Sequence, residues 1–165
     1  MGHAVRRARV IALAFALVLP AMAARAAGPD AKATNTIEDC IKTAAPAGKP
    51  MTAAERCIGI VSNPCLDDKK TKSTADMNAC VDRERAVWDD ILNETYRRLA
   101  AKLDADQKGK LRDMQRAWIP SRDKTCGFYW DFYQGTMASP MAAACVNRET
   151  ARRAIFLLSF LYDDR

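Results

Sequence analysis

The feature that most constrains the fold is a long helical repeat of apolar residues in the middle of the chain. After Ser73-Thr-Ala-Asp76, which is typical of a helix N-terminal cap, apolar residues recur at steps of three and four up to Leu103. This spacing places them on one face of an α-helix. At about 1.5 Å of rise per residue, these ~28 residues span roughly 42 Å. A rod of this length buries its stripe against other helices, so the sequence predicts an all-α fold.

Two further helices are predicted after this one. The second runs from about Asp106 to near Tyr133, and the third begins at Ser139, where Pro140 suits a first turn. No segment shows the alternation of a strand. The expected architecture is a disulfide-stapled helical bundle, built on a long helical hairpin with a third helix packed along it. Pro120 lies inside the second helix and lacks an N–H, so we expect a kink there.

The residues before the bundle form an N-terminal extension, residues 27–64. Capping boxes predict two short helices in it, at about 37–44 and 53–61. We expect residues 27–35 to be a mobile leader and Asn63-Pro64 to end the second helix. Residues 65–165 then form the helical domain.

The first 26 residues have the pattern of a secretory signal peptide. Arginines precede ten apolar residues, 10–19, and Ala24-Arg25-Ala26 offers a cleavage site. The apolar run is shorter than the ~20 residues that span a membrane, so no membrane insertion is expected. Cleavage removes four of the 26 basic residues and none of the 20 acidic ones, which lowers the net charge from +6 to +2. A chain so close to neutrality does not bind nucleic acid, and we predict a periplasmic or secreted protein.

Export also limits the chemistry. The only histidine, His3, lies in the predicted signal peptide, so the exported chain has no imidazole for general-base catalysis or zinc binding. The six cysteines all follow the signal, and an even number in an oxidising compartment predicts disulfides rather than nucleophiles or metal ligands. We therefore expect no catalytic residue, no metal and no cofactor.

Six cysteines allow fifteen pairings. Cys126 and Cys145 flank the turn between the second and third helices, so a disulfide there would close a hairpin. In the chain-entropy model a loop of this length is worth about 3 kcal/mol. A Cys65–Cys80 bond would tie a charged loop to the long helix, which leaves Cys40 with Cys57.

One carboxylate interrupts the apolar stripe. Glu84 lies between Val81 and Trp88, and a charge in that position is costly unless it is paired. We expect a partly buried polar network that fixes helix register; the alternative is a functional cleft. Its members are Glu84, Gln115, Arg122 and Arg153.

The stretch FYWDFY, residues 128–133, places five aromatic residues in six positions. They cannot all face inward on one helix, so some form an exposed contact patch, with Tyr129 and Phe132 as candidates, or are covered by the N-terminal segment. The three tryptophans are expected in the core; the alternative is a platform for sugar stacking.

Four stretches resemble the LprI-type lysozyme inhibitor family: MNACVDRERAVWDDILNETYRRL, LRDMQRAWIPSRDKTC, GTM and CVNRETARRAIFLL. The resemblance covers about Cys65 to Leu158. It implies an all-helical fold and, by the family's name, inhibition of lysozyme. Its most specific residues include five that we assign to the structural polar network: Asn93, Tyr96, Arg116, Asp123 and Thr150.

Three functions compete. The first is an inhibitor that pushes a loop into the carboxylate cleft of a lysozyme, without chemistry of its own. The second is an envelope structural or adaptor domain that binds another protein through the aromatic patch. The third, a carboxylate-dependent hydrolase, is disfavoured by the missing histidine. Two loops could enter a cleft, and their candidate residues are Lys69, Lys70 and Lys72 in CLDDKKTKS and Thr136 and Ser139 in QGTMASP.

Overall fold

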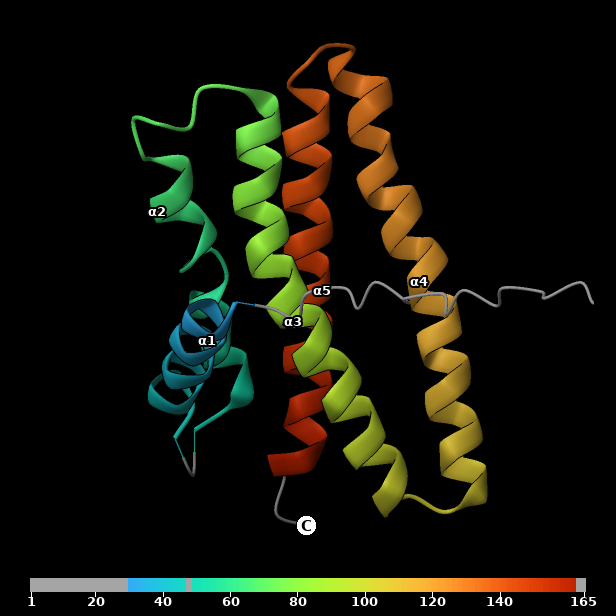
Figure 1. Cartoon of the computed structure of the whole chain (residues 1–165). Coiled ribbons are helices and arrows are strands. Elements are labelled where there is room, and N and C mark those ends of the chain that lie inside the picture. The colour runs from blue at the N-terminus through green and yellow to red at the C-terminus, as the bar shows by residue number, and fades with distance from the viewer. Residues whose placement is uncertain (1–29, 47–48, 163–165) are drawn as a thin grey trace, which may run out of the picture.

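The structure, a computed structural model, describes residues 30–46 and 49–162. The predicted signal peptide, residues 1–26, lies outside the described residues. The described chain folds into helices without a strand, which confirms the all-α prediction (Figure 1). The elements are α1 (Ala31–Ala44), the 3-10 helix η1 (Met51–Cys57), α2 (Ser62–Leu66), α3 (Thr74–Lys102), α4 (Ala105–Tyr133) and α5 (Ala138–Tyr162).

The two longest helices begin where side chains satisfy their first N–H groups. The Ser73 hydroxyl accepts from the Asp76 N–H at 3.1 Å, and the Asp76 carboxylate accepts from the Ser73 N–H at 2.9 Å. Asp104 and Gln107 form the same reciprocal cap at the start of α4. Such capping boxes fix where a helix starts, which is why the predicted starts agree with the structure to within two residues.

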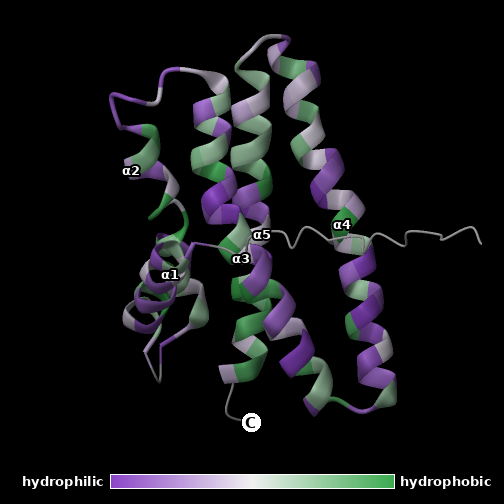
Figure 2. Ribbon diagram, viewed as in Figure 1, coloured by the Kyte–Doolittle hydropathy of each residue, from purple (hydrophilic) through white to green (hydrophobic). Residues whose placement is uncertain are grey.

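The third helix packs against both arms of the hairpin. α5 lies along α3 and also contacts α4, while α1 and η1 cover the side of α3 and α5 that is remote from α4 (Figure 1). Trp88, Ile37 and Leu157 are among the largest fully buried side chains, so one hydrophobic core spans α3, α5 and the extension. Figure 2 shows hydrophilic residues over the loop before α3 and over much of α4.

α4 is the least buried long helix. It continues through Pro120 as one helix to Tyr133, and its C-terminal half leans toward α5 (Figure 1). Proline removes one internal hydrogen bond but does not end α4. Leu111 and Cys126 are its only buried residues. Most of the surface of α4 is therefore exposed to solvent.

The N-terminal extension differs from its predicted form. Residues 31–35, expected in a mobile leader, are helical because the Asp30 side chain caps α1 by accepting from the Lys32 N–H at 2.8 Å. η1 ends at Cys57, since Gly59 has a φ of 93° and turns the chain. Asn63-Pro64 lies inside α2 rather than ending a helix, because a proline is tolerated in a first turn.

Three disulfides join neighbouring helical elements. Cys40–Cys57 links α1 to η1, Cys65–Cys80 links α2 to α3, and Cys126–Cys145 links α4 to α5. These are the three pairs expected from the sequence, in which Cys40–Cys57 is the pair left by the other two. Each closes a loop of 15 to 19 residues, so each is worth about 3 kcal/mol in the chain-entropy model. Within the described residues, no helix is both long enough and apolar enough to cross a membrane.

Candidate contact surface

Glu84 is fully buried and its carboxylate accepts five hydrogen bonds. Oε1 accepts from the Gly59 N–H at 2.7 Å, the Trp88 indole at 3.2 Å and the Asn147 amide at 3.0 Å. Oε2 accepts from the N–H groups of Val61 and Ser62 at 2.9 and 2.8 Å. No cation pairs with it among the described residues. Hydrogen bonds from backbone amides thus replace the ion pair that a buried carboxylate usually requires.

Opposing influences set the pKa of Glu84. Burial is the largest and raises the pKa, because it penalises the charged form. The hydrogen bonds from Asn147, Ser62, Gly59 and Val61 favour the carboxylate and together outweigh burial, so the pKa lies below its ordinary value. Glu84 is therefore ionised and sealed, which makes it a structural group rather than a general acid.

The expected single network is two separate clusters. Glu84 has no hydrogen bond to Gln115, Arg122 or Arg153, because its acceptor sites are filled by the turn at 59–62 and by Asn147. Sequence reasoning missed Asn147. A polar residue between the buried Cys145 and Thr150 on α5 was the available signal.

The second cluster joins α4 to α5 around Trp118. The guanidinium carbon atoms of Arg122 and Arg153 lie 4.9 and 5.5 Å from the centre of the indole ring. Arg153 also donates to the Gln115 side-chain carbonyl. Burial lowers the pKa of Arg153, and its Nη2 atom is buried without a hydrogen-bond partner in the described structure. The Arg153 guanidinium therefore lies against aromatic rings and one amide, and the cluster packs α4 against α5.

The residues that the family resemblance added are dispersed. Asn93 and Arg116 are exposed, while Tyr96 is half-buried against the core. Asp123 is exposed and accepts from Arg122 at 2.8 Å. Thr150 is fully buried, and its hydroxyl has no hydrogen-bond partner in the described structure. Only Asp123 therefore belongs to the Trp118 cluster through a hydrogen bond.

The last turns of α4 and the turn that follows it expose a group of large apolar side chains, which we call the aromatic tip. Trp130 is 54% exposed and Phe132 is 66% exposed, whereas Tyr129 is half-buried and stacks on Tyr133 with ring centres 5.8 Å apart. Trp130 is thus not in the core, unlike Trp88. Five exposed side chains make up the aromatic tip: Phe128, Trp130, Phe132, Tyr133 and Met137.

A disulfide and a hydrogen bond restrain the α4–α5 turn beside the aromatic tip. α4 ends where Gln134 takes a left-handed conformation, with a φ of 41°, and α5 begins four residues later. The Cys126–Cys145 disulfide joins the two helices below this turn. Close to the turn, at the start of α5, the Ser139 hydroxyl accepts a hydrogen bond from the Asn78 side chain of α3 at 2.7 Å. Ser139 is thus engaged within the bundle, whereas Thr136 is exposed at the turn.

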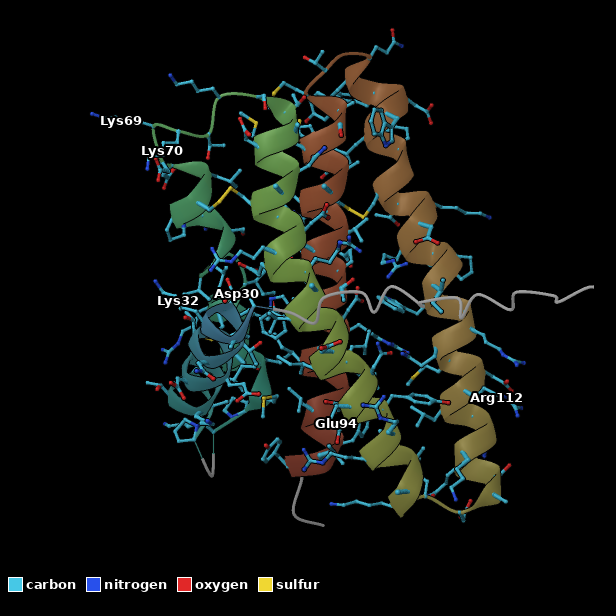
Figure 3. The ribbon with its side chains drawn as sticks, in the orientation of Figure 1. Asp30, Lys32, Lys69, Lys70, Glu94 and Arg112 are labelled. Atoms are coloured by element: carbon cyan, nitrogen blue, oxygen red, sulfur yellow. A yellow bond between two sulfur atoms is a disulfide. The ribbon has the colours of Figure 1, made fainter. Side chains whose placement is uncertain are left out.

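The stretch CLDDKKTKS, residues 65–73, which we call the lysine loop, lies at the same end of the bundle as the aromatic tip but on the side remote from α4. Figure 3 shows Lys69 and Lys70 at the edge remote from α4, and Lys72 is exposed as well. Lys70 lines an open hollow of about 730 Å³ between α1, α2 and α3. The structure therefore divides the predicted contact residues between two surfaces. The described residues contain no cluster of three or more histidine, cysteine or acidic side chains suited to a metal ion.

Comparison with known proteins identifies one family. The profile described as "LprI: Lysozyme inhibitor LprI" matches residues 65–157. "Uncharacterized protein R02472" of Rhizobium meliloti (strain 1021) is 31% identical, and the match covers 54% of this chain and 75% of that protein. No solved structure matches the chain.

Proposed function

The chain belongs to the LprI lysozyme inhibitor family, and we propose that it is an exported, non-catalytic protein that inhibits a lysozyme by covering the substrate cleft. Lysozymes cleave peptidoglycan with two carboxyl groups in a sugar-binding cleft. A protein that fills this cleft needs shape and surface rather than reactive groups. The disulfides fit export, because disulfides persist in oxidising compartments.

The observation that carries this proposal is the aromatic tip. Aromatic side chains supply a large share of binding energy at protein interfaces, and a monomer exposes few of them together without a use. The tip lies beside the α4–α5 turn, which also exposes Thr136. The disulfide and the Asn78–Ser139 hydrogen bond hold the turn in place, which lowers the entropy lost on binding.

The rest of the molecule offers little for catalysis. Glu84, the most buried carboxylate, has all its hydrogen bonds filled by the protein and cannot reach a substrate. The sequence has no histidine after His3. The lysine loop is a weaker candidate for the contact, because the surrounding carboxylates of Asp67 and Asp68 offset its charge.

The test is turnover of peptidoglycan by a lysozyme, measured as clearing of cell walls while the purified protein is titrated to micromolar excess. We expect the wild type to slow the enzyme. The double variant Trp130→Ala with Phe132→Ala should lose at least tenfold in apparent affinity, as interface anchors do. Tyr162→Ser is the matched control: Tyr162 is 61% exposed at the far end of α5, so this variant should inhibit like the wild type.

The outcomes separate the two binding functions. No slowing at micromolar excess would remove the inhibitor proposal. Crosslinking to an envelope protein that is lost in the double variant would then favour an adaptor that uses the same aromatic tip. Inhibition that is unchanged in the double variant would instead place the contact elsewhere, with the lysine loop tested next through Lys69→Ala and Lys72→Ala.

A further inference from the structure

A second apolar surface lies at the opposite end of the bundle from the aromatic tip. The end of α3, the start of α4 and the end of α5 line an open groove of about 690 Å³. Phe160 in this groove is 42% exposed, and it packs edge-on against the exposed Phe156 with ring centres 5.1 Å apart. The apolar lining of the groove consists of Leu99, Leu103, Leu111, Met114 and Phe160.

The rim of this groove is polar and cationic. Lys102, Gln107 and Lys110 line it together with the apolar residues. Lys110 pairs with Asp106 at 2.8 Å on the exposed side of α4. Lys102 makes no ion pair with any residue in the described part of the chain. Among the described residues, the charged side chains that line the groove are Lys102 and Lys110, so its rim carries cations beside an apolar floor.

This end of the bundle also concentrates the charge of the chain. Residues 97–116, which form the α3–α4 turn and its flanks, contain seven basic and three acidic residues, a net charge of +4. The whole chain after the predicted signal peptide has a net charge of only +2, so the remainder is slightly acidic. The positive charge is thus concentrated at the end of the bundle that holds the groove, and two of its lysines, Lys102 and Lys110, line the groove itself.

We propose that the groove between the end of α3, the start of α4 and the end of α5 binds a long-chain fatty acid, with the acyl chain on the apolar floor and the carboxylate beside Lys102 and Lys110. The groove volume is in the range of small-molecule sites, which are mostly apolar with a few polar groups that set orientation. A lysine ammonium is a flexible point charge and suits a mobile carboxylate at a rim. Neither lysine is needed for packing, since both are exposed.

The experiment measures binding of palmitate to the purified chain without its signal peptide. Palmitate is titrated below its micelle concentration against an environment-sensitive anionic fluorophore bound to the protein, and displacement is followed. Hexadecanol and hexadecyltrimethylammonium carry the same chain length with a neutral and a cationic head group. We expect palmitate to displace the fluorophore at micromolar concentration, hexadecanol to bind less tightly, and the cationic amphiphile to bind least.

Variants locate the site. Lys102→Ala with Lys110→Ala should weaken palmitate binding about fivefold and leave hexadecanol unchanged, since two exposed charge contacts are lost. Leu103→Glu places a carboxylate at the half-buried edge of the groove and should abolish palmitate binding. Far-ultraviolet circular dichroism verifies that each variant is folded. Lys69→Ala with Lys72→Ala, on the distant lysine loop, is the matched control and should bind palmitate like the wild type.

Three results would overturn the proposal: no displacement by palmitate, equal binding of the cationic amphiphile, or equal loss in the Lys69 and Lys72 control. The lysozyme assay provides an independent readout. The Lys102 and Lys110 variant should inhibit lysozyme like the wild type, because the aromatic tip lies at the other end of the bundle. The fatty-acid proposal and the lysozyme-inhibitor proposal can therefore be refuted independently of each other.

Discussion

Replacing Glu84 by glutamine tests the central structural claim, that one buried carboxylate attaches the N-terminal extension to α3 and α5. Glutamine has nearly the same shape but carries a donor where the carboxylate carries an acceptor. If its amide nitrogen replaces Oε2, the N–H groups of Val61 and Ser62 lose their acceptor. If it replaces Oε1, the donors from Gly59 and Trp88 lose theirs, together with the amide of the α5 asparagine.

The magnitude follows from these donors. A buried donor without a partner costs about 1–3 kcal/mol, and at least two are orphaned in either orientation of the amide. Removing the charge recovers part of its desolvation cost. We therefore expect Glu84→Gln to lower the free energy of unfolding by about 3 kcal/mol.

The assay is urea unfolding at neutral pH, followed by circular dichroism. Glu94→Gln is the matched control: Glu94 is exposed on the same helix, where it pairs with Arg97 at 2.7 Å (Figure 3). The control should change the free energy of unfolding by less than about 0.5 kcal/mol, as expected for an exposed ion pair. A decrease of less than about 1 kcal/mol in the free energy of unfolding of Glu84→Gln would refute the reasoning, because at least two buried donors lose their acceptor in this variant.

The pH dependence has a definite sign. The pKa of Glu84 is lower in the folded protein than its ordinary value of 4.5. Its contribution to stability is therefore fully present above pH 4.5 and is lost as the pH falls through the lower, folded pKa. The difference between the wild type and Glu84→Gln should shrink over that acidic range. A difference that grows on acidification would contradict the assignment.

Four further outcomes are expected. Arg153→Ala should destabilise by about 2 kcal/mol in urea unfolding, because it removes the packing between α4 and α5 together with the charge. Thr150→Val should be neutral or stabilise by up to about 1 kcal/mol in the same assay, since the buried hydroxyl has no hydrogen-bond partner in the described structure. Replacing Cys126 and Cys145 together by serine should cost about 3 kcal/mol, visible as a lower thermal midpoint under non-reducing conditions. A chain of residues 65–165 alone should show low cooperativity on heating, because it lacks the N–H donors of residues 59–62.

The long helices and the disulfides could be predicted because their signals are local. A period of 3.6 residues predicted both α3 and α4, and the cap at Ser73 predicted where α3 begins. The cap formed by Asp104 and Gln107 at the start of α4 is seen only in the structure. The spacing of Cys126 and Cys145 across one turn suggested their bond, and the structure contains it. Aromatic crowding in residues 128–133 predicted exposed rings, since one helix face cannot bury five neighbouring rings. Phe132 is exposed, whereas Tyr129, the other candidate, is half-buried.

The partners of Glu84 could not be predicted from the sequence. Three of its five donors are backbone N–H groups, which every residue except proline carries, so no side-chain pattern marks them. They converge at a turn in which Gly59 takes a positive φ. The arginine partners proposed from the sequence were chemically reasonable. They belong instead to Trp118, whose ring lies between α4 and α5.

The position of these donors bears on how the chain is built. The family match covers residues 65–157, so the turn at 59–62 lies outside it, although Glu84 lies inside. The turn covers the carboxylate, which without it would keep Trp88 and Asn147 but lose three of its five donors. Cys40–Cys57 and Cys65–Cys80 secure the two flanks of the same turn. These contacts predict that the extension folds together with the bundle. It packs on α3 and α5, whereas the aromatic tip and the groove lie at the two ends of the bundle.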